Sequence, residues 1–129
     1  MGKYWRLIAE LTGEATTWEA AAGAAQASPY TPDEDAILVG IRTMVGRTAA
    51  TTLTGQVQVR LSCTTWKPNT IHVMAVGGGL QTAPAVPVPP QDFEVNQPVK
   101  AGVPITIESR CLVANDVTND IAVMGCFQS

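Results

Sequence analysis

Hydrophobic and polar residues alternate over a long stretch near the end of the chain. Polar or charged residues such as Thr106 and Glu108 alternate in residues 103–113 with the apolar Val103, Ile105, Ile107, Cys111 and Val113. After a polar segment, a similar pattern resumes in residues 121–127. A period of two is typical of a β-strand that buries one face. The pattern therefore predicts two long strands joined by a polar turn, that is, a hairpin.

Other segments also show the patterns of strands. Residues 56–63 give the cleanest example, because apolar and polar residues alternate strictly there, so one face should be buried and the other hydrated. The remaining predicted strands are residues 4–11, with Trp5, Leu7, Ala9 and Leu11 on one side, residues 36–45, with Ile37, Val39, Ile41 and Val45 on one side, residues 71–76 and residues 93–99. The threonine-rich residues 46–55 fit a connection or an edge strand.

Two segments are expected to differ from this pattern. A short helix is predicted near residues 17–26, because a threonine precedes good helix formers there; a loop that packs Trp18 is the alternative. Residues 83–90 contain repeated prolines, which exclude a helix or a central strand and favour an extended path. We expect this segment and residues 1–32 to act as arms that pack on neighbouring subunits, so deleting 83–90 should lower the oligomeric state without unfolding the monomer.

Six or seven short strands with turn signals between them predict the fold class. No alternation of strands with helices appears, so a parallel sheet is not expected. The prediction is an all-β protein, a single antiparallel β-sandwich that is jelly-roll-like, with at most one short N-terminal helix. The 129 residues are expected to form one domain.

Composition and charge narrow the range of functions. Charged residues make up 15% of the chain, against about 25% in typical domains, which favours burial against partner subunits. The net charge of −3 and the lack of a basic run argue against nucleic acid as a partner. No apolar stretch is long enough to predict a transmembrane helix, and the first ten residues lack the core of a signal peptide, so we expect neither a membrane partner nor export by that route.

The three cysteines are expected to be buried, reduced thiols. Cys63, Cys111 and Cys126 cannot all pair within one chain, and their spacing does not resemble that of a zinc site. In the predicted hairpin, Cys111 points into the core and Cys126 points to the opposite face, which argues against a disulfide between them.

No set of residues predicts an enzyme. His72 is the single histidine and lies in a predicted strand, where a place on the polar face is the simpler interpretation. The glycines of residues 77–79 are followed by prolines, so no helix can begin there to bind a phosphate. Glu94 and Glu108 would have to face each other across a cleft to act as a catalytic pair. We therefore predict no catalytic residues, no cofactor and no metal.

Acidic loops leave calcium open as an alternative. Residues 33–35 and the Asn-Asp pairs at 115–116 and 119–120 could supply oxygen ligands. Turn chemistry explains Asn and Asp in these positions equally well.

Aromatic and proline residues supply the candidate contacts. Trp5 alternates with apolar residues and is predicted to lie in the core, whereas Trp66 lies in a predicted turn, where it either forms an exposed contact or caps the core. The candidates for an interface or a binding site are Trp18, Tyr30, Trp66, Pro87, Pro89 and Pro90.

Two resemblances point to viruses. The segment Tyr4-Trp5-Arg6-Leu7 resembles the opening strand of discoidin-like sandwich domains in some phage tail proteins. The whole chain resembles small β-sandwich proteins of virions, such as head decoration and minor capsid proteins, in its scarce charge, its connections rich in threonine, alanine and proline, and strands such as residues 102–107 and 121–125. This resemblance implies assembly into a trimer or a larger lattice, within a particle.

The sequence thus predicts a non-enzymatic structural protein that self-associates, most plausibly a viral capsid or capsid-decoration component located in the virion. Its expected partners are copies of itself and other capsid proteins. The alternative is a carbohydrate- or ligand-binding β-sandwich module that uses the aromatic residues.

Overall fold

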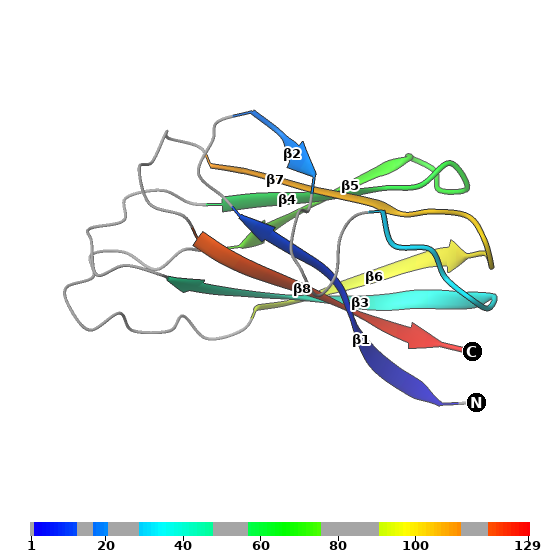
Figure 1. The fold of residues 1–129 in the computed structure, drawn as a ribbon. Coiled ribbons are helices and arrows are strands. Elements are labelled where there is room, and N and C mark those ends of the chain that lie inside the picture. Colours follow the sequence, from blue (N-terminus) through cyan, green and yellow to red (C-terminus); the bar gives the residue numbers. More distant parts are fainter. Residues whose placement is uncertain (1, 13–16, 21–28, 48–56, 76–90, 112–118) are drawn as a thin grey trace.

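The strands of this chain form two antiparallel sheets that pack face to face (Figure 1). The computed structural model describes residues 2–12, 17–20, 29–47, 57–75, 91–111 and 119–129, and these residues form strands and no helix. The strands are β1 (Lys3–Thr12), β2 (Glu19–Ala20), β3 (Ala36–Arg47), β4 (Val57–Ser62), β5 (Thr70–Ala75), β6 (Gln91–Val99), β7 (Thr106–Cys111) and β8 (Asn119–Gln128). The predicted all-β antiparallel sandwich is confirmed.

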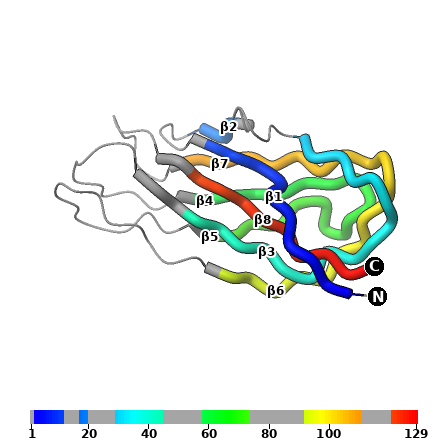
Figure 2. The backbone as a smooth tube through the Cα atoms, turned by 60° about the horizontal axis from the view of Figure 1, so that its bottom comes forward, coloured from blue at the N-terminus to red at the C-terminus, as the bar shows by residue number. Residues whose placement is uncertain are grey.

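The strand order is that of one long hairpin rolled up from its tip. The tip is the antiparallel pair β4–β5, and outward from it β3 pairs with β6, β2 with β7 and β1 with β8. Two further pairings, β3–β8 and β4–β7, complete sheet A, with the order β1-β8-β3-β6, and sheet B, with the order β2-β7-β4-β5. Figure 2 shows the four strands of sheet A following one another across the molecule. Both chain ends lie at one end of the sandwich, where Lys3 pairs with Gln128.

The hydrophobic core lies between the two sheets and takes side chains from both. Sheet A contributes Leu38 and Val123, and sheet B contributes Val59 and Ile107, all of them buried. The alternation predicted for residues 56–63 is confirmed over β4, since Val59 and Leu61 are buried and the polar residues between them are not. Alternation therefore identifies which face of this strand meets the opposite sheet.

The predicted C-terminal hairpin is wrong. β7 pairs with β2 and β4 in sheet B, whereas β8 pairs with β1 and β3 in sheet A. Alternation shows that each strand has one buried face, but two strands that share a core can lie beside each other in one sheet or opposite each other in two sheets. The pattern alone does not separate these arrangements.

A bulge in β1 corrects the predicted position of Trp5. The register of β1 with β8 shifts between Leu7 and Ala9, so that Ile8 is an extra residue. Such a bulge exchanges the faces of the residues on its two sides. Ile8, Ala9 and Leu11 are buried, and Trp5 lies on the outer face of sheet A with 38% of its surface exposed. The prediction that Trp5 belongs to the core is therefore wrong.

A similar irregularity corrects the predicted inner face of residues 36–45. The register of β3 shifts between Leu38 and Gly40 against both neighbouring strands. Leu38 and Ile41 are buried, whereas Ile37, predicted to point inward, is 44% exposed. Strict alternation fails on both strands for the same physical reason, a change of register in the middle of the strand.

The N-terminal segment forms part of the sandwich over its described residues. β1 is paired along its length with β8, so residues 3–12 are a strand of sheet A and not a detached arm. Glu19–Ala20 pairs with β7, so the helix predicted near 17–26 is wrong for residues 17–20, because tertiary pairing overrides local propensity there. Tyr30 forms a backbone bridge with Ile105, with N···O distances of 2.9 and 2.8 Å. Residues 13–16, 21–28 and 48–56 lie outside the described residues.

Two cysteines can be compared with their predicted positions. Cys63 and Cys126 are buried, free thiols, as expected. Cys126 lies opposite Trp5 and Gly40 in the register of sheet A and therefore faces away from the core, as predicted from alternation. The side chain of Cys111 lies outside the described part of the structure.

Candidate functional site

The outer face of sheet B is polar. Its inward residues, including Leu61 and Val73, belong to the core, and the residues that alternate with them point outward. The described outward side chains of β4, β5 and β7 are Gln58, Arg60, Ser62, Thr70, His72, Thr106, Glu108 and Arg110. The predicted place of His72 on the polar face of its strand is confirmed, since His72 is exposed there.

Trp18 lies across this polar face. The guanidinium carbon of Arg60 is 4.3 Å from the centroid of its ring, and that of Arg110 is 4.7 Å away. The imidazole of His72 meets the ring edge-on, with 5.7 Å between centroids. Cation–π contacts of this length are favourable. Trp18 is half-buried, so this interface candidate contacts its own sheet and thereby covers part of it.

An ion pair holds one of the two arginines beneath Trp18, and a hydrogen bond to a neutral amide holds the other. Arg60 Nε donates to Glu108 Oε1 at 2.8 Å, and Arg110 Nε donates to Gln58 Oε1 at 2.8 Å. Glu94 lies on β6 of the other sheet, so Glu94 and Glu108 do not face each other across a cleft. The arrangement therefore does not provide the opposed carboxylates that glycoside hydrolysis uses.

The outer face of sheet A is apolar at its centre and carries charged side chains toward its edges. The residues of β8 alternate between the core, where Val123 and Phe127 are buried, and this outer face. The described apolar side chains on the outer face are Trp5, Leu7, Ile37, Met44, Ala122, Met124 and Cys126. Exposed patches of this kind mark interaction sites on soluble proteins.

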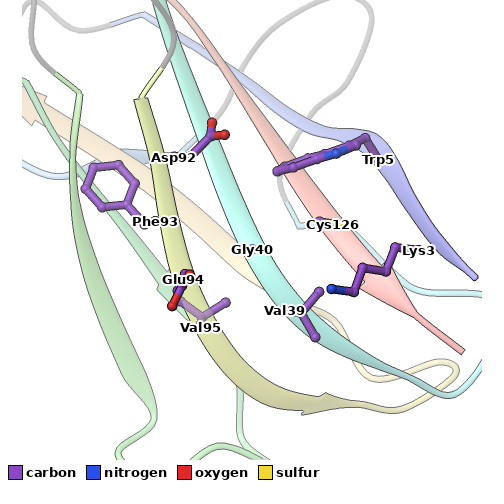
Figure 3. A pocket seen from close by; sticks show the side chains of 9 residues that line it. All are labelled: Lys3, Trp5, Val39, Gly40, Asp92, Phe93, Glu94, Val95 and Cys126. Carbon is purple, nitrogen blue, oxygen red and sulfur yellow. The ribbon is translucent and has the colours of Figure 1, made fainter.

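A shallow pocket of about 560 Å³ lies on the outer face of sheet A (Figure 3). Gly40 lines the pocket without a side chain, and a Cβ at this position would contact Cys126 Cβ at 3.4 Å and Trp5 Cη2 at 3.5 Å. Figure 3 shows Trp5 and Lys3 on one side of the pocket and Asp92 and Glu94 on the other. The pocket thus joins an aromatic surface to charges of both signs.

Arg42 and Asp92 form an ion pair at the border of this pocket. Arg42 donates to Asp92 from Nε at 2.7 Å and from Nη2 at 2.9 Å, in bidentate geometry. The same guanidinium lies 4.3 Å from the centroid of the Trp5 ring. Hydrogen bonding to Arg42 lowers the pKa of Asp92 below the ordinary value of an aspartate. The pair holds Trp5 in place and carries little net charge itself.

The acidic loop 33–35 uses its carboxylates separately. Tyr4 Oη donates to Glu34 Oε1 at 2.7 Å, Asp35 Oδ1 accepts from the backbone N–H of Ala101 at 2.9 Å, and Asp33 lies 3.9 Å from Arg6. The hydrogen bond to the Glu34 carboxylate raises the pKa of Tyr4, because it favours the neutral phenol. Within the described ranges, no three His, Cys, Asp or Glu side chains come together as metal ligands. The calcium alternative gains no support from this loop; residues 115–118 lie outside the described part.

The remaining candidates are separated in the structure. Trp66 is 1% exposed, and its indole Nε1 donates to the Pro98 carbonyl oxygen at 2.8 Å. It therefore caps the core, and its interpretation as an exposed contact is wrong. Tyr30 is half-buried and stacks on Phe127, with 6.1 Å between ring centroids. Pro87, Pro89 and Pro90 lie outside the described residues.

Sequence reasoning missed the outer face of sheet A. Its central residues, Trp5, Gly40 and Arg42, were not among the predicted sites, because bulges change which residues of β1 and β3 face outward. One signal was available: residues 121–127 are apolar without interruption. A strand with this composition is typical of a sheet covered on both faces.

Comparisons with known proteins give no evidence about the function. The chain matches no protein-family model and no curated protein sequence. Among the described residues, no helix is long and apolar enough to cross a membrane.

Proposed function

We propose that this chain is a jelly-roll structural protein that self-associates, and that it serves as a capsid or capsid-decoration component of a virion. The observation that carries the proposal is the strand order, β1-β8-β3-β6 in one sheet and β2-β7-β4-β5 in the other. This order supports a jelly roll, an architecture of eight strands that occurs in viral capsid proteins, lectins and cupins. The strand order thus favours a small set of protein classes, one of which is structural.

The two outer faces favour the structural class within this set. A catalytic or metal-binding role would need converging side chains, whereas the carboxylates of Glu34, Asp35 and Glu108 have separate partners. The outer face of sheet A instead exposes Trp5 and Ile37 over a largely apolar surface. Association removes such a surface from water, which stabilises the assembled state.

The expected assembly is a trimer or a larger lattice with virion partners. The edge strands are β1 and β6 in sheet A and β2 and β5 in sheet B. Edge strands present unpaired backbone groups, and packing against a neighbouring subunit protects them. Together with the low share of charged residues, this supports a subunit that works in contact with others.

The molar mass in solution tests this proposal. Light scattering behind a sizing column is expected to give a defined multiple of 13.6 kDa, and electron microscopy of the same fractions is expected to show capsomers or closed particles. A mass of 13.6 kDa at the highest soluble concentration would count against self-association.

A second candidate function is the binding of a small carbohydrate. The pocket beside Trp5 favours it, because a sugar ring could stack on the indole while Glu94 and Lys3 accept and donate hydrogen bonds. Simple sugars should then quench tryptophan fluorescence, and Trp5→Ala should abolish the response. An equal response in the variant would remove this candidate.

A further inference from the structure

The centre of the outer face of sheet A is an exposed apolar surface. Trp5 and Ile37 are the large hydrophobic side chains that are exposed among the described residues, and both lie on this face. Ala122 and Met124 extend this apolar surface along β8, beside Leu7 and Met44, on a strand whose other side is already buried in the core. Since strands that are apolar on both sides occur in sheets covered on both faces, we expect this face to be covered by another surface.

The charges on this face are arranged at opposite edges. Lys3 lies on β1 and Glu94 on β6, the two edge strands of sheet A. Both residues are exposed, and neither forms an ion pair with another described residue. Arg42 and Asp92, by contrast, neutralise each other. At the end of the face where Lys3 pairs with Gln128, β1 therefore carries an uncompensated positive charge, and β6 carries an uncompensated negative charge at Glu94. Glu10, on the same face of β1, lies toward the opposite end of the strand, beside Ala122.

We propose that a second copy of this chain covers the outer face of sheet A through a twofold axis that runs parallel to the strands. Such an axis places β1 of each copy over β6 of the other, with Lys3 level with Pro98 and Trp5 level with Glu94 of the partner. The step of two residues from Lys3 to Trp5 spans about 7 Å, a distance that the long Lys3 side chain can cross to approach Glu94. The face is then complementary to itself in charge, as an isologous contact requires. This inference rests on the proposed self-association and names one of its contacts.

The geometry of sheet packing agrees with this arrangement. Two sheets packed face to face lie about 10 Å apart with their strands within about 30° of each other. A side chain such as Trp5 can span part of this gap, and the pocket over Gly40 offers space for a side chain of the other copy. The contact would continue the layered packing of the sandwich into a further pair of layers.

The extent of the apolar surface favours a second copy over a small ligand. The pocket is lined by Trp5 and Gly40, but Ile37, Leu7 and Met124 lie outside its lining. A ligand confined to the pocket would leave these side chains in water. A second sheet would cover them together with the pocket.

Charge reversal tests this contact. Lys3→Glu and Glu94→Lys each place like charges opposite each other across the proposed twofold, and each is expected to weaken association by at least about tenfold. The double variant restores opposite charges and should return the dissociation constant to near that of the wild-type chain. Because both residues are exposed, the monomer should stay folded, which circular dichroism checks. His72→Glu, on the outer face of sheet B, is the matched control and should leave the molar mass unchanged.

The outcomes separate this inference from the proposed function. If both single variants assemble to the same molar mass as the wild-type chain, the proposed contact is wrong and self-association still stands. Single variants that dissociate without rescue in the double variant would overturn the pairing of Lys3 with Glu94. A wild-type chain that stays monomeric at every concentration would overturn both proposals.

Discussion

The two outer faces of this sandwich are covered in different ways. The outer face of sheet B is polar, and the chain itself lays the Trp18 ring over Arg60 and Arg110. The outer face of sheet A is apolar at its centre, and Trp5 and Ile37 are exposed on it. Each face carries a tryptophan stacked with arginine, since Arg42 lies on the Trp5 ring. The polar face is thus completed within the chain, whereas the apolar face gains stability only when something else covers it.

The three tryptophans act as reporters of three environments. Trp66 lies in the shared core, Trp5 on the outer face of sheet A and Trp18 on that of sheet B. Substitutions at these positions should therefore separate stability of the monomer from association. Each substitution tests one of these three environments separately.

The largest effect is expected in the core that both faces share. Trp66→Ala should reduce the free energy of unfolding by about 3–5 kcal/mol, because it removes a buried ring and leaves a cavity. Urea denaturation of the monomer measures this change. Trp66→Phe is the matched control and should cost less, since it keeps an aromatic ring and loses the hydrogen bond to the Pro98 carbonyl oxygen. A Trp66→Ala variant as stable as the wild-type chain would contradict the position of this side chain in the core.

The second-largest loss of stability is expected at a glycine on the core side of sheet A. A Cβ at Gly125, on the core side, would lie 3.0 Å from Phe127 Cε2 and 3.1 Å from Leu38 Cδ1. Gly125→Ala should therefore destabilise the monomer by about 1–3 kcal/mol through overpacking.

Gly40→Ala is the control for that substitution on the outer side of the same sheet. Its Cβ would meet Cys126 and Trp5 at 3.4 and 3.5 Å, closer to ordinary contact distances, so a smaller loss of stability is expected. Thermal denaturation of both variants checks that Gly125→Ala loses more stability than Gly40→Ala. A larger loss for Gly40→Ala would show that the outer side is packed as tightly as the core.

The sequence predicted the fold class because alternation is a property of single strands. β4 shows this best, since its polar residues lie outside and Val59 and Leu61 lie inside. Which strands lie side by side is a property of the whole chain, and the predicted pairing of residues 103–113 with 121–127 was wrong for that reason. The candidate site was missed because the bulges at Ile8 and Val39 exchange faces, and no local pattern in those segments indicates a bulge.

A smaller effect is expected at Trp18. Trp18→Ala removes two cation–π contacts and should lower the free energy of unfolding by about 1–2 kcal/mol, while the molar mass stays the same. Trp5→Ala should instead leave monomer stability almost unchanged and lower the molar mass of the assembly. Denaturation at low concentration and light scattering at high concentration measure the two quantities. A loss of association in Trp18→Ala alone would reverse the roles of the two faces.

The smallest effect concerns the titration of Asp92. Its folded-state pKa is lowered by Arg42, so the stabilisation from this pair is present above the ordinary aspartate pKa and is lost as the pH falls through the lowered value. Arg42→Gln should raise the pKa of Asp92 toward its ordinary range. The carboxyl carbon shift of Asp92, followed by NMR against pH, reports this directly. Arg60→Gln, on the other face, is the control and should leave the Asp92 titration unchanged.

Hydroxyl-radical footprinting of the assembled protein tests the central claim most directly. Oxidation of Trp5 and Trp18 is compared between a dilute monomeric sample and a concentrated assembled one, with the molar mass measured on both. The difference between the faces predicts that assembly protects Trp5 and leaves the reactivity of Trp18 unchanged. An assembled sample in which Trp5 stays as reactive as in the monomer would contradict the claim that the outer face of sheet A is the surface through which this protein associates.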